Sequence, residues 1–113
     1  MIAVIFEVEP AEGAMEDYLA HAARLRPELE AIDGFLSVER FESLTTPGKL
    51  VSISFWRDEA AVAAWRNRPE HRASQAAGRS GMMTGYRIRV AAVLRDYGLE
   101  ARAQAPADSR AVL

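Results

Sequence analysis

The sequence contains no cysteine, a single lysine (Lys49), two histidines and no long apolar run. Without cysteine, a disulfide framework and thiol catalysis are excluded. No apolar run approaches the ~18 to 20 residues that a helix needs to cross a bilayer, so we expect no membrane partner. The first residues do not form a signal-peptide pattern, which together with the absence of cysteine favours a cytoplasmic protein.

Neither positive nor negative charge predominates in the sequence. The 14 Lys and Arg residues against 16 Asp and Glu give a net charge of -2, with both signs mixed along the chain. A nucleic-acid-binding protein needs a basic face, so we expect no nucleic-acid partner. Small molecules and other proteins are the expected partners.

Several cofactor motifs are missing as well. The sequence has no glycine-rich phosphate loop, no GxGxxG, no CxxC or HxxxH pair and no GxSxG elbow. His21 and His71 are far apart in the chain, which disfavours a transition-metal site. We therefore expect no cofactor and no metal.

The apolar pattern predicts six elements in one domain, since 113 residues can bury roughly 65% of the extended-chain surface. Alternating apolar residues indicate strands, spacings of three and four indicate helices, and Pro47-Gly48 indicates a hairpin turn. Pro27 and Pro69 predict a kink or break in each helix. The predicted elements are strands 2–8, 35–41, 50–56 and 86–97, a helix over 14–32, and one kinked helix or two short ones from 60 to about 77.

This order, β-α-β-β-α-β, is typical of a ferredoxin-like α+β fold, in which both helices cover one face of an antiparallel sheet. The other face then needs cover, and Ala3, Ile5, Ala91 and Val93 add apolar residues to it. We therefore expect a homodimer that packs sheet to sheet. The domain is predicted to span residues 1–98, and residues 99–113 form a tail that is either mobile or packed on the partner subunit.

Between helices and sheet, one cluster of side chains could carry chemistry. Asn67, His71 and Gln75 would share one side of a continuous helix, and Tyr86 opens the last strand. His71 is the candidate proton carrier, because an unperturbed imidazole titrates at about 6.5. We predict catalytic roles for these four residues. The predicted pocket-lining residues are Trp65, Phe55, Phe6 and Met82.

Simpler explanations exist for the same residues. Trp65 could only fill the core, and His71, flanked by Glu70 and Arg72, could lie in solvent. His21 is expected at the surface or boundary of the first helix. For Arg87 and Arg89 we favour ion pairs with Glu7, Glu39 or Glu42 across the sheet over binding of an anionic substrate.

The chain resembles the antibiotic biosynthesis monooxygenase family, and specifically small single-domain members of the dimeric α/β-barrel superfamily. The likeness covers Met1 to about Gly98, and its most specific parts are Gly34-Phe35, PGKLVSISFW, AWRN with the following EH, and RDYG. The resemblance implies a ferredoxin-like protomer paired with its twin, and a pocket between helices and sheet in each subunit. Members of the family oxidise aromatic polyketides to quinones without metal or flavin, degrade haem, or isomerise small signalling molecules.

The resemblance favours a cofactor-independent monooxygenase acting on a small apolar aromatic or quinol-type molecule. A non-catalytic dimeric module, which binds a small molecule or is associated with stress, is the alternative. The haem-degrading branch is similar in shape, but Gln75 stands at its histidine place and Phe6 near its asparagine place. Haem cleavage is thus disfavoured, unless a shift at Pro69 brings His71 to the iron.

Overall fold

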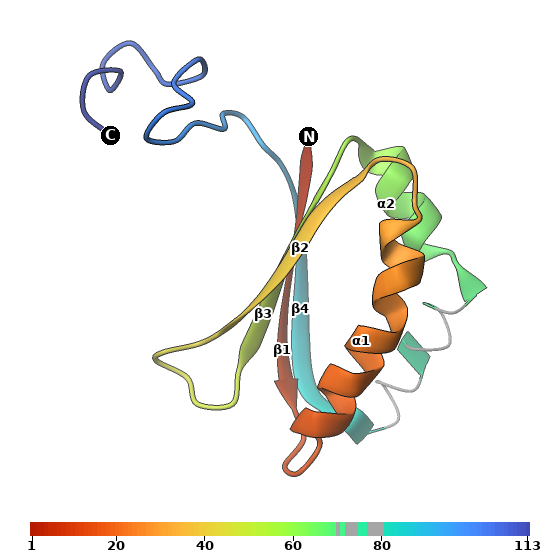
Figure 1. Ribbon diagram of the computed structural model, residues 1–113. Helices are drawn as coiled ribbons and strands as arrows, with labels where there is room; N and C mark the ends of the chain where they lie inside the picture. Colours follow the sequence, from red (N-terminus) through yellow and green to blue (C-terminus); the bar gives the residue numbers. More distant parts are fainter. Residues whose placement is uncertain (70, 72–74, 77–80) are drawn as a thin grey trace.

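The computed structural model describes residues 1–69, 71, 75, 76 and 81–113, and it confirms the α+β fold (Figure 1). The sheet has the strand order β2-β3-β1-β4, and every neighbouring pair is antiparallel. The element order is β-α-β-β-α-β, as predicted. The elements are β1 (Ile2–Pro10), α1 (Met15–Glu30), β2 (Phe35–Glu42), β3 (Leu50–Trp56), α2 (Glu59–Arg66) and β4 (Met83–Ala92).

Both helices lie on one side of the sheet, and the core lies between the helices and the sheet (Figure 1). Its centre is Trp56, whose indole N–H donates to the buried Ser54 hydroxyl at 2.9 Å. This bond removes the cost of burying two polar groups. The other buried members of the core cluster are Leu29, Ala61 and Val62, and the partly buried residues packed against it are Ile2, Val4, Ile32, Phe35, Val38 and Trp65.

At Pro27 a kink or a break was predicted, and the break is wrong. α1 is a single helix that runs through Pro27 to Glu30. Proline removes only the bond to the carbonyl of Ala23, and here it does so in the last turn. Burial of Leu29 against the sheet side holds that turn in place.

Two glycines allow the predicted connections to form. Gly48 has a φ of 79° in the β2–β3 turn, which confirms the hairpin predicted from Pro47-Gly48. Gly34 has a φ of 95°, and a Cβ there would lie 2.8 Å from the Cβ of Ala61. The chain between α1 and β2 therefore packs closely against α2 because residue 34 has no side chain.

The second helical segment is divided: α2 is its first part, and the described residues Pro69, His71, Gln75 and Ala76 are again helical. The Asp58 carboxylate accepts the N–H of Ala61 at 2.9 Å and begins α2, which ends at Arg66. Asn67 follows as the C-cap. Much of the predicted continuation to Ala77 lies outside the described residues.

The last strand was predicted over 86–97, and that range is wrong at both ends. β4 begins at Met83, opposite Pro10, and ends at Ala92, opposite Ile2. One further backbone hydrogen bond continues the pairing, from the N–H of Val93 to the carbonyl of Met1 at 3.0 Å. The chain after Val93 leaves the sheet and projects away from the body (Figure 1).

Within the described parts of the chain, no helix is both long and apolar enough to cross a membrane.

Candidate functional site

A stacked pair of rings, Trp65 and His71, lies at the end of α2. Their centroids are 4.4 Å apart and the ring planes are inclined by 29°. Trp65 also packs against the core cluster, and both residues are half-buried. His71 is therefore held against the body of the protein, and the alternative of a fully solvated histidine does not describe it.

A hydrogen bond fixes the chemistry of the His71 ring. Its Nδ1 lies 3.1 Å from the carbonyl oxygen of Trp65. A carbonyl can only accept, so Nδ1 carries the hydrogen. In the neutral imidazole the lone pair is then on Nε2, which is the atom able to take up a proton.

An apolar strip lies on the helix side of the sheet, along β4 and β1. The register pairs Val4 with Val90, Phe6 with Ile88 and Val8 with Tyr86, so all six side chains share the face on which Val4 meets the core. Phe6 and Tyr86 are in ring contact, with centroids 6.0 Å apart. Tyr86, Ile88 and Val90 nevertheless remain 55%, 49% and 49% exposed. A strip this apolar and this open suits a planar, apolar ligand.

Asn67 and Gln75 are the other donors predicted on this part of the chain. Asn67 is exposed, and its side-chain amide donates to the carbonyl of Ala63 at 2.9 Å. The prediction that Asn67, His71 and Gln75 share one side required a continuous helix. α2 ends at Arg66, before all three residues. Gln75 is half-buried. The structure thus joins His71 to Trp65, which lies six positions before it and is not a helical neighbour.

One of the predicted lining residues, Phe55, lies on the other side of the sheet. Phe55 pairs with Ala3, and the adjacent Trp56 points to the helices, so Phe55 is on the opposite face of the sheet. Alternation along β3 does not allow Phe55 and Trp56 to share a face. Met82 is half-buried just before β4, where its carbonyl accepts the N–H of Ala11 at 2.8 Å.

A polar pair on the helix side was missed by the sequence analysis. Arg40 lies on the face of Val38, and its guanidinium is next to the hydroxyl of Tyr18 on α1. Burial raises the pKa of Tyr18, and the charge and hydrogen bond of Arg40 oppose that rise. The Nε of Arg40 is buried and has no hydrogen-bond partner among the described residues. The alternation of side chains along residues 35–41 could have predicted that Arg40 shares the helix-side face with Val38.

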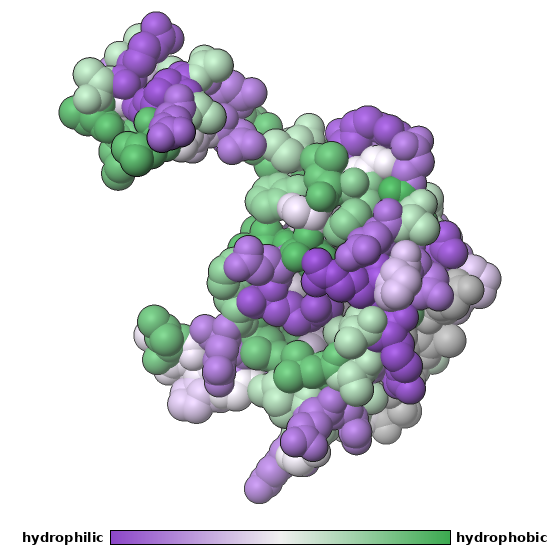
Figure 2. Space-filling view, in the orientation of Figure 1, coloured by the Kyte–Doolittle hydropathy of each residue, from purple (hydrophilic) through white to green (hydrophobic). Residues whose placement is uncertain are grey.

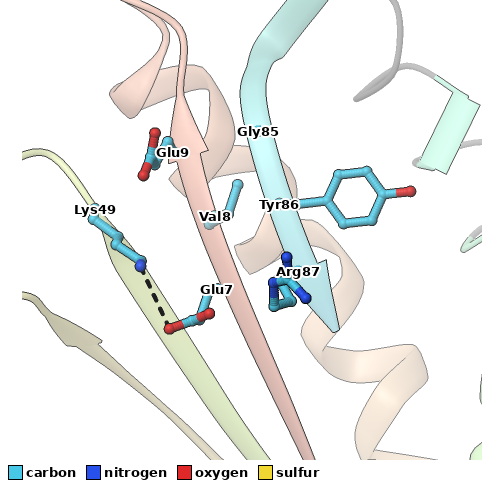
Figure 3. A pocket seen from close by; sticks show the side chains of 7 residues that line it. All are labelled: Glu7, Val8, Glu9, Lys49, Gly85, Tyr86 and Arg87. Carbon is cyan, nitrogen blue, oxygen red and sulfur yellow. Dashed lines mark ion pairs between the residues drawn. The ribbon is translucent and has the colours of Figure 1, made fainter. Parts of the chain in front are cut away.

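The open face of the sheet has a hollow of about 180 Å³ that is lined mainly by charged residues (Figure 3). Glu7 binds Lys49 at 3.4 Å and Arg89 at 2.8 Å, which confirms the ion-pair interpretation for Arg89. The hydrogen bond from Arg89, followed by the influence of Lys49, lowers the pKa of Glu7. The hollow is smaller than the roughly 300 Å³ of a typical small-molecule pocket. Figure 3 also shows the Tyr86 ring pointing away from it.

Metal ligands do not gather in the part of the chain that is described: no three His, Asp or Glu side chains there could hold one ion.

Comparison with known proteins gives a consistent result. The sequence profile of the family described as antibiotic biosynthesis monooxygenase matches residues 1–77. A protein of Pyricularia oryzae named jasmonate monooxygenase ABM is 45% identical over 93 residues, which are 82% of this chain and 43% of that protein. The chain therefore spans less than half the length of this relative.

Solved structures share the fold. Rv0793 from Mycobacterium tuberculosis superposes with a TM-score of 0.76 at 24% identity, over 86% of this chain and 98% of that one. SnoaB, a cofactor-independent oxygenase from Streptomyces nogalater solved as the mutant N63A, gives a TM-score of 0.73 at 14% identity. The alignment with SnoaB covers 84% of this chain and 94% of that chain. At these identities the likeness concerns the fold.

Proposed function

Because the chain belongs to the antibiotic biosynthesis monooxygenase family, we propose that it is a cofactor-independent monooxygenase acting on a small apolar aromatic or quinol-type molecule. The observation that carries the proposal is the His71–Trp65 pair, a proton acceptor held on an aromatic wall, on the side of the sheet that bears an exposed apolar strip. The relative named as a monooxygenase supports the reaction type.

In the proposed reaction, His71 Nε2 takes a proton from an electron-rich ring carbon that carries two hydrogens. The resulting carbanion gives electrons to molecular oxygen. One oxygen atom becomes a carbonyl on that carbon, and the other leaves as water with the two hydrogens, so the four electrons lost by the substrate reduce one O₂. The protein contributes the proton acceptor, an apolar surface and hydrogen bonds to the developing oxyanion.

The other roles follow from position. Phe6, Tyr86 and Trp65 would bind the rings of the substrate, and the Tyr86 hydroxyl would orient its oxygen. Gln75 and Asn67 are proposed as further donors, and Asn67 would have to release the carbonyl of Ala63 to act as one. We also propose that two copies pair through their open sheet faces, as expected from the half-buried Ile5, Ile53 and Phe55 on that face.

Jasmonate is a second candidate substrate because of the relative's name. It is an anion, and Arg40 is a cationic group on the helix side of the sheet with a buried Nε. Binding of jasmonate would therefore depend on Arg40, whereas binding of a neutral quinol would not. The exposure of Asn67 and Tyr86 favours the other alternative, a binding module without catalysis.

An oxygen electrode tests these alternatives. Protein treated with a chelator and free of flavin is mixed with a panel of hydroquinones, an anthrone and jasmonate. We expect oxygen uptake that depends on protein concentration with at least one of them. Binding of the compounds without oxygen uptake would support the binding module instead.

A further inference from the structure

The register of the sheet places a cation in line with the apolar strip. Arg40 on β2 pairs with Ser52 on β3, and Ser52 pairs in turn with Phe6 on β1. Phe6 pairs with Ile88 on β4. Since Arg40 shares the face of Val38, which packs on the core, this row of residues crosses the helix side of the sheet. The row begins with a guanidinium, continues through a hydroxyl and ends on the apolar strip.

The dimensions of this row fit a small molecule with one polar end. Neighbouring strands lie about 4.8 Å apart, so the backbone of Arg40 is roughly 10 Å from that of Phe6 and roughly 14 Å from that of Ile88. The main helix contacts with the sheet are those of α1 with β2 and of α2 with β3. Figure 2 shows hydrophilic side chains gathered where β2 and α1 lie in Figure 1. The polar end of the row is therefore at β2 and the apolar end is at β4.

Arg40 is a half-buried cation without a carboxylate of its own. No ion pair among the described residues includes Arg40, and Glu42, the next residue on this face of β2, is exposed. The Nε of Arg40 is buried, and no described residue accepts its hydrogen. Lys49 and Arg89, by comparison, are both paired with Glu7 on the other face. A shielded charge and a buried donor without an acceptor both cost free energy, and a bound anion would offset both costs.

The neighbour of Arg40 is a hydroxyl and not an acid. Burial raises the pKa of Tyr18, and the charge and hydrogen bond of Arg40 oppose that rise. The ordinary pKa of a tyrosine is about 10, so the Tyr18 hydroxyl keeps its hydrogen at neutral pH. A neutral hydroxyl leaves the charge of the guanidinium uncompensated, but it can donate to the same anion as the guanidinium.

We propose that the acidic group of a ligand binds at Arg40, with Tyr18 and Ser52 as further donors. The apolar part of the ligand then lies along Phe6 and Ile88. A guanidinium fork matches a carboxylate and gives it two parallel charge-assisted hydrogen bonds. The ligand class is thus a small aromatic or alicyclic acid, and a neutral molecule of the same shape binds less tightly. This inference rests on the proposed function for the location of the ligand, and it adds the acidic group.

Two ligands that differ in charge and little in shape test the site. 2-Naphthoate is an anion at neutral pH and 2-naphthamide is its neutral counterpart, and isothermal titration calorimetry measures both dissociation constants. We expect the wild type to bind naphthoate at least about tenfold more tightly than naphthamide, since hydrogen bonds to a charged group are worth about ten- to hundredfold in affinity. Arg40→Gln should lose about this factor for naphthoate and less than about twofold for naphthamide.

Arg87→Gln is the matched control for this experiment. Arg87 is an exposed arginine of β4 that pairs with Glu7 in the register, on the other face of the sheet. The variant removes the same charge as Arg40→Gln and should change neither dissociation constant. A wild type that binds naphthoate no more tightly than naphthamide, or an equal loss for both ligands in Arg40→Gln, would overturn the proposal.

NMR of the ¹⁵N-labelled wild type tests the contact without a variant that has to fold. We expect the Nε–H signal of Arg40 to shift on titration with naphthoate and much less with naphthamide, while that of Arg87 stays in place. An unshifted Arg40 signal at saturating naphthoate would overturn the proposal. Neither readout uses oxygen. Acid binding at Arg40 without oxygen uptake would refute the reaction alone, and oxygen uptake with a neutral quinol but no preference for acids would refute the acid site alone.

Discussion

The imidazole of His71 lies stacked on the indole of Trp65, with ring centroids 4.4 Å apart, and its Nδ1 donates to the Trp65 carbonyl at 3.1 Å. One residue therefore sets both the plane of the ring and its tautomer. Trp65 itself packs on the core. The candidate proton acceptor is thus tied to the buried core through Trp65, and support by packed side chains is what a catalytic group requires.

Removal of the imidazole should abolish most of the activity. In His71→Ala we expect the rate of oxygen uptake to fall by about 10²- to 10⁴-fold, the usual contribution of general acid-base catalysis. His21→Ala is the control, since His21 is a half-buried histidine on α1 that accepts a hydrogen bond from Arg24. Equal rates in the two variants would rule out the role of His71.

Trp65 should contribute to stability as well as to the site. We expect Trp65→Ala to lower the free energy of unfolding by about 2 kcal/mol, less than the 3–5 kcal/mol typical of a fully buried tryptophan. Trp65→Phe keeps a ring under His71 and should cost less. Urea unfolding of both variants measures the difference. A Trp65→Ala protein as stable as the wild type would show that packing of Trp65 against the core does not stabilise the fold.

The apolar strip should bind ligand without being needed for folding. Ile88→Asn is expected to weaken binding of a naphthoquinone about tenfold through loss of apolar contact. Leu36→Asn, at a 53% exposed leucine on β2, matches the 49% exposure of Ile88 and should bind normally. Quenching of tryptophan fluorescence gives both constants. If both variants bind equally well, the ligand does not lie on this strip.

Acid should destabilise the fold through Asp58 and Glu7. The backbone N–H of Ala61 and then Arg57 lower the pKa of Asp58, and Arg89 lowers that of Glu7. A lowered pKa means that the stabilisation is complete above the ordinary value, 3.8 for Asp58 and 4.5 for Glu7, and is lost as the pH falls below it.

Thermal unfolding between pH 7 and pH 2.5 tests this dependence. Asp58→Asn keeps a capping side chain that does not titrate, so its unfolding temperature should fall less on acidification than that of the wild type. Asp58→Ala loses the cap and should unfold a few degrees lower already at pH 7. An Asp58→Asn curve parallel to that of the wild type would contradict the assignment.

Much of the fold follows from the sequence because its signals are local. Alternation predicted β3 to the residue, and Pro47-Gly48 predicted the turn before it. The end of β4 could not be predicted, since it depends on how far its pairing with β1 extends. The continuity of α1 through Pro27 depends likewise on the burial of Leu29.

The candidate site was harder to predict, because it combines residues by packing. Helical spacing grouped His71 with Asn67 and Gln75, whereas the ring contact is with Trp65. Phe55 was predicted to line the pocket, although alternation with Trp56 puts it on the other face of the sheet. The pairing of Arg40 with Tyr18 joins a strand to a helix, and no spacing along the chain reports such a contact.

The most direct test of the proposed reaction is isotopic. Chelator-treated, flavin-free protein is incubated under ¹⁸O₂ with an anthrone, or with another compound that supports oxygen uptake. The mass of the product is then measured by mass spectrometry. We predict that one ¹⁸O atom enters the new carbonyl with the wild type and that His71→Ala forms little product. A product without ¹⁸O from the gas, or a reaction that requires added flavin or metal, would contradict a cofactor-independent monooxygenase.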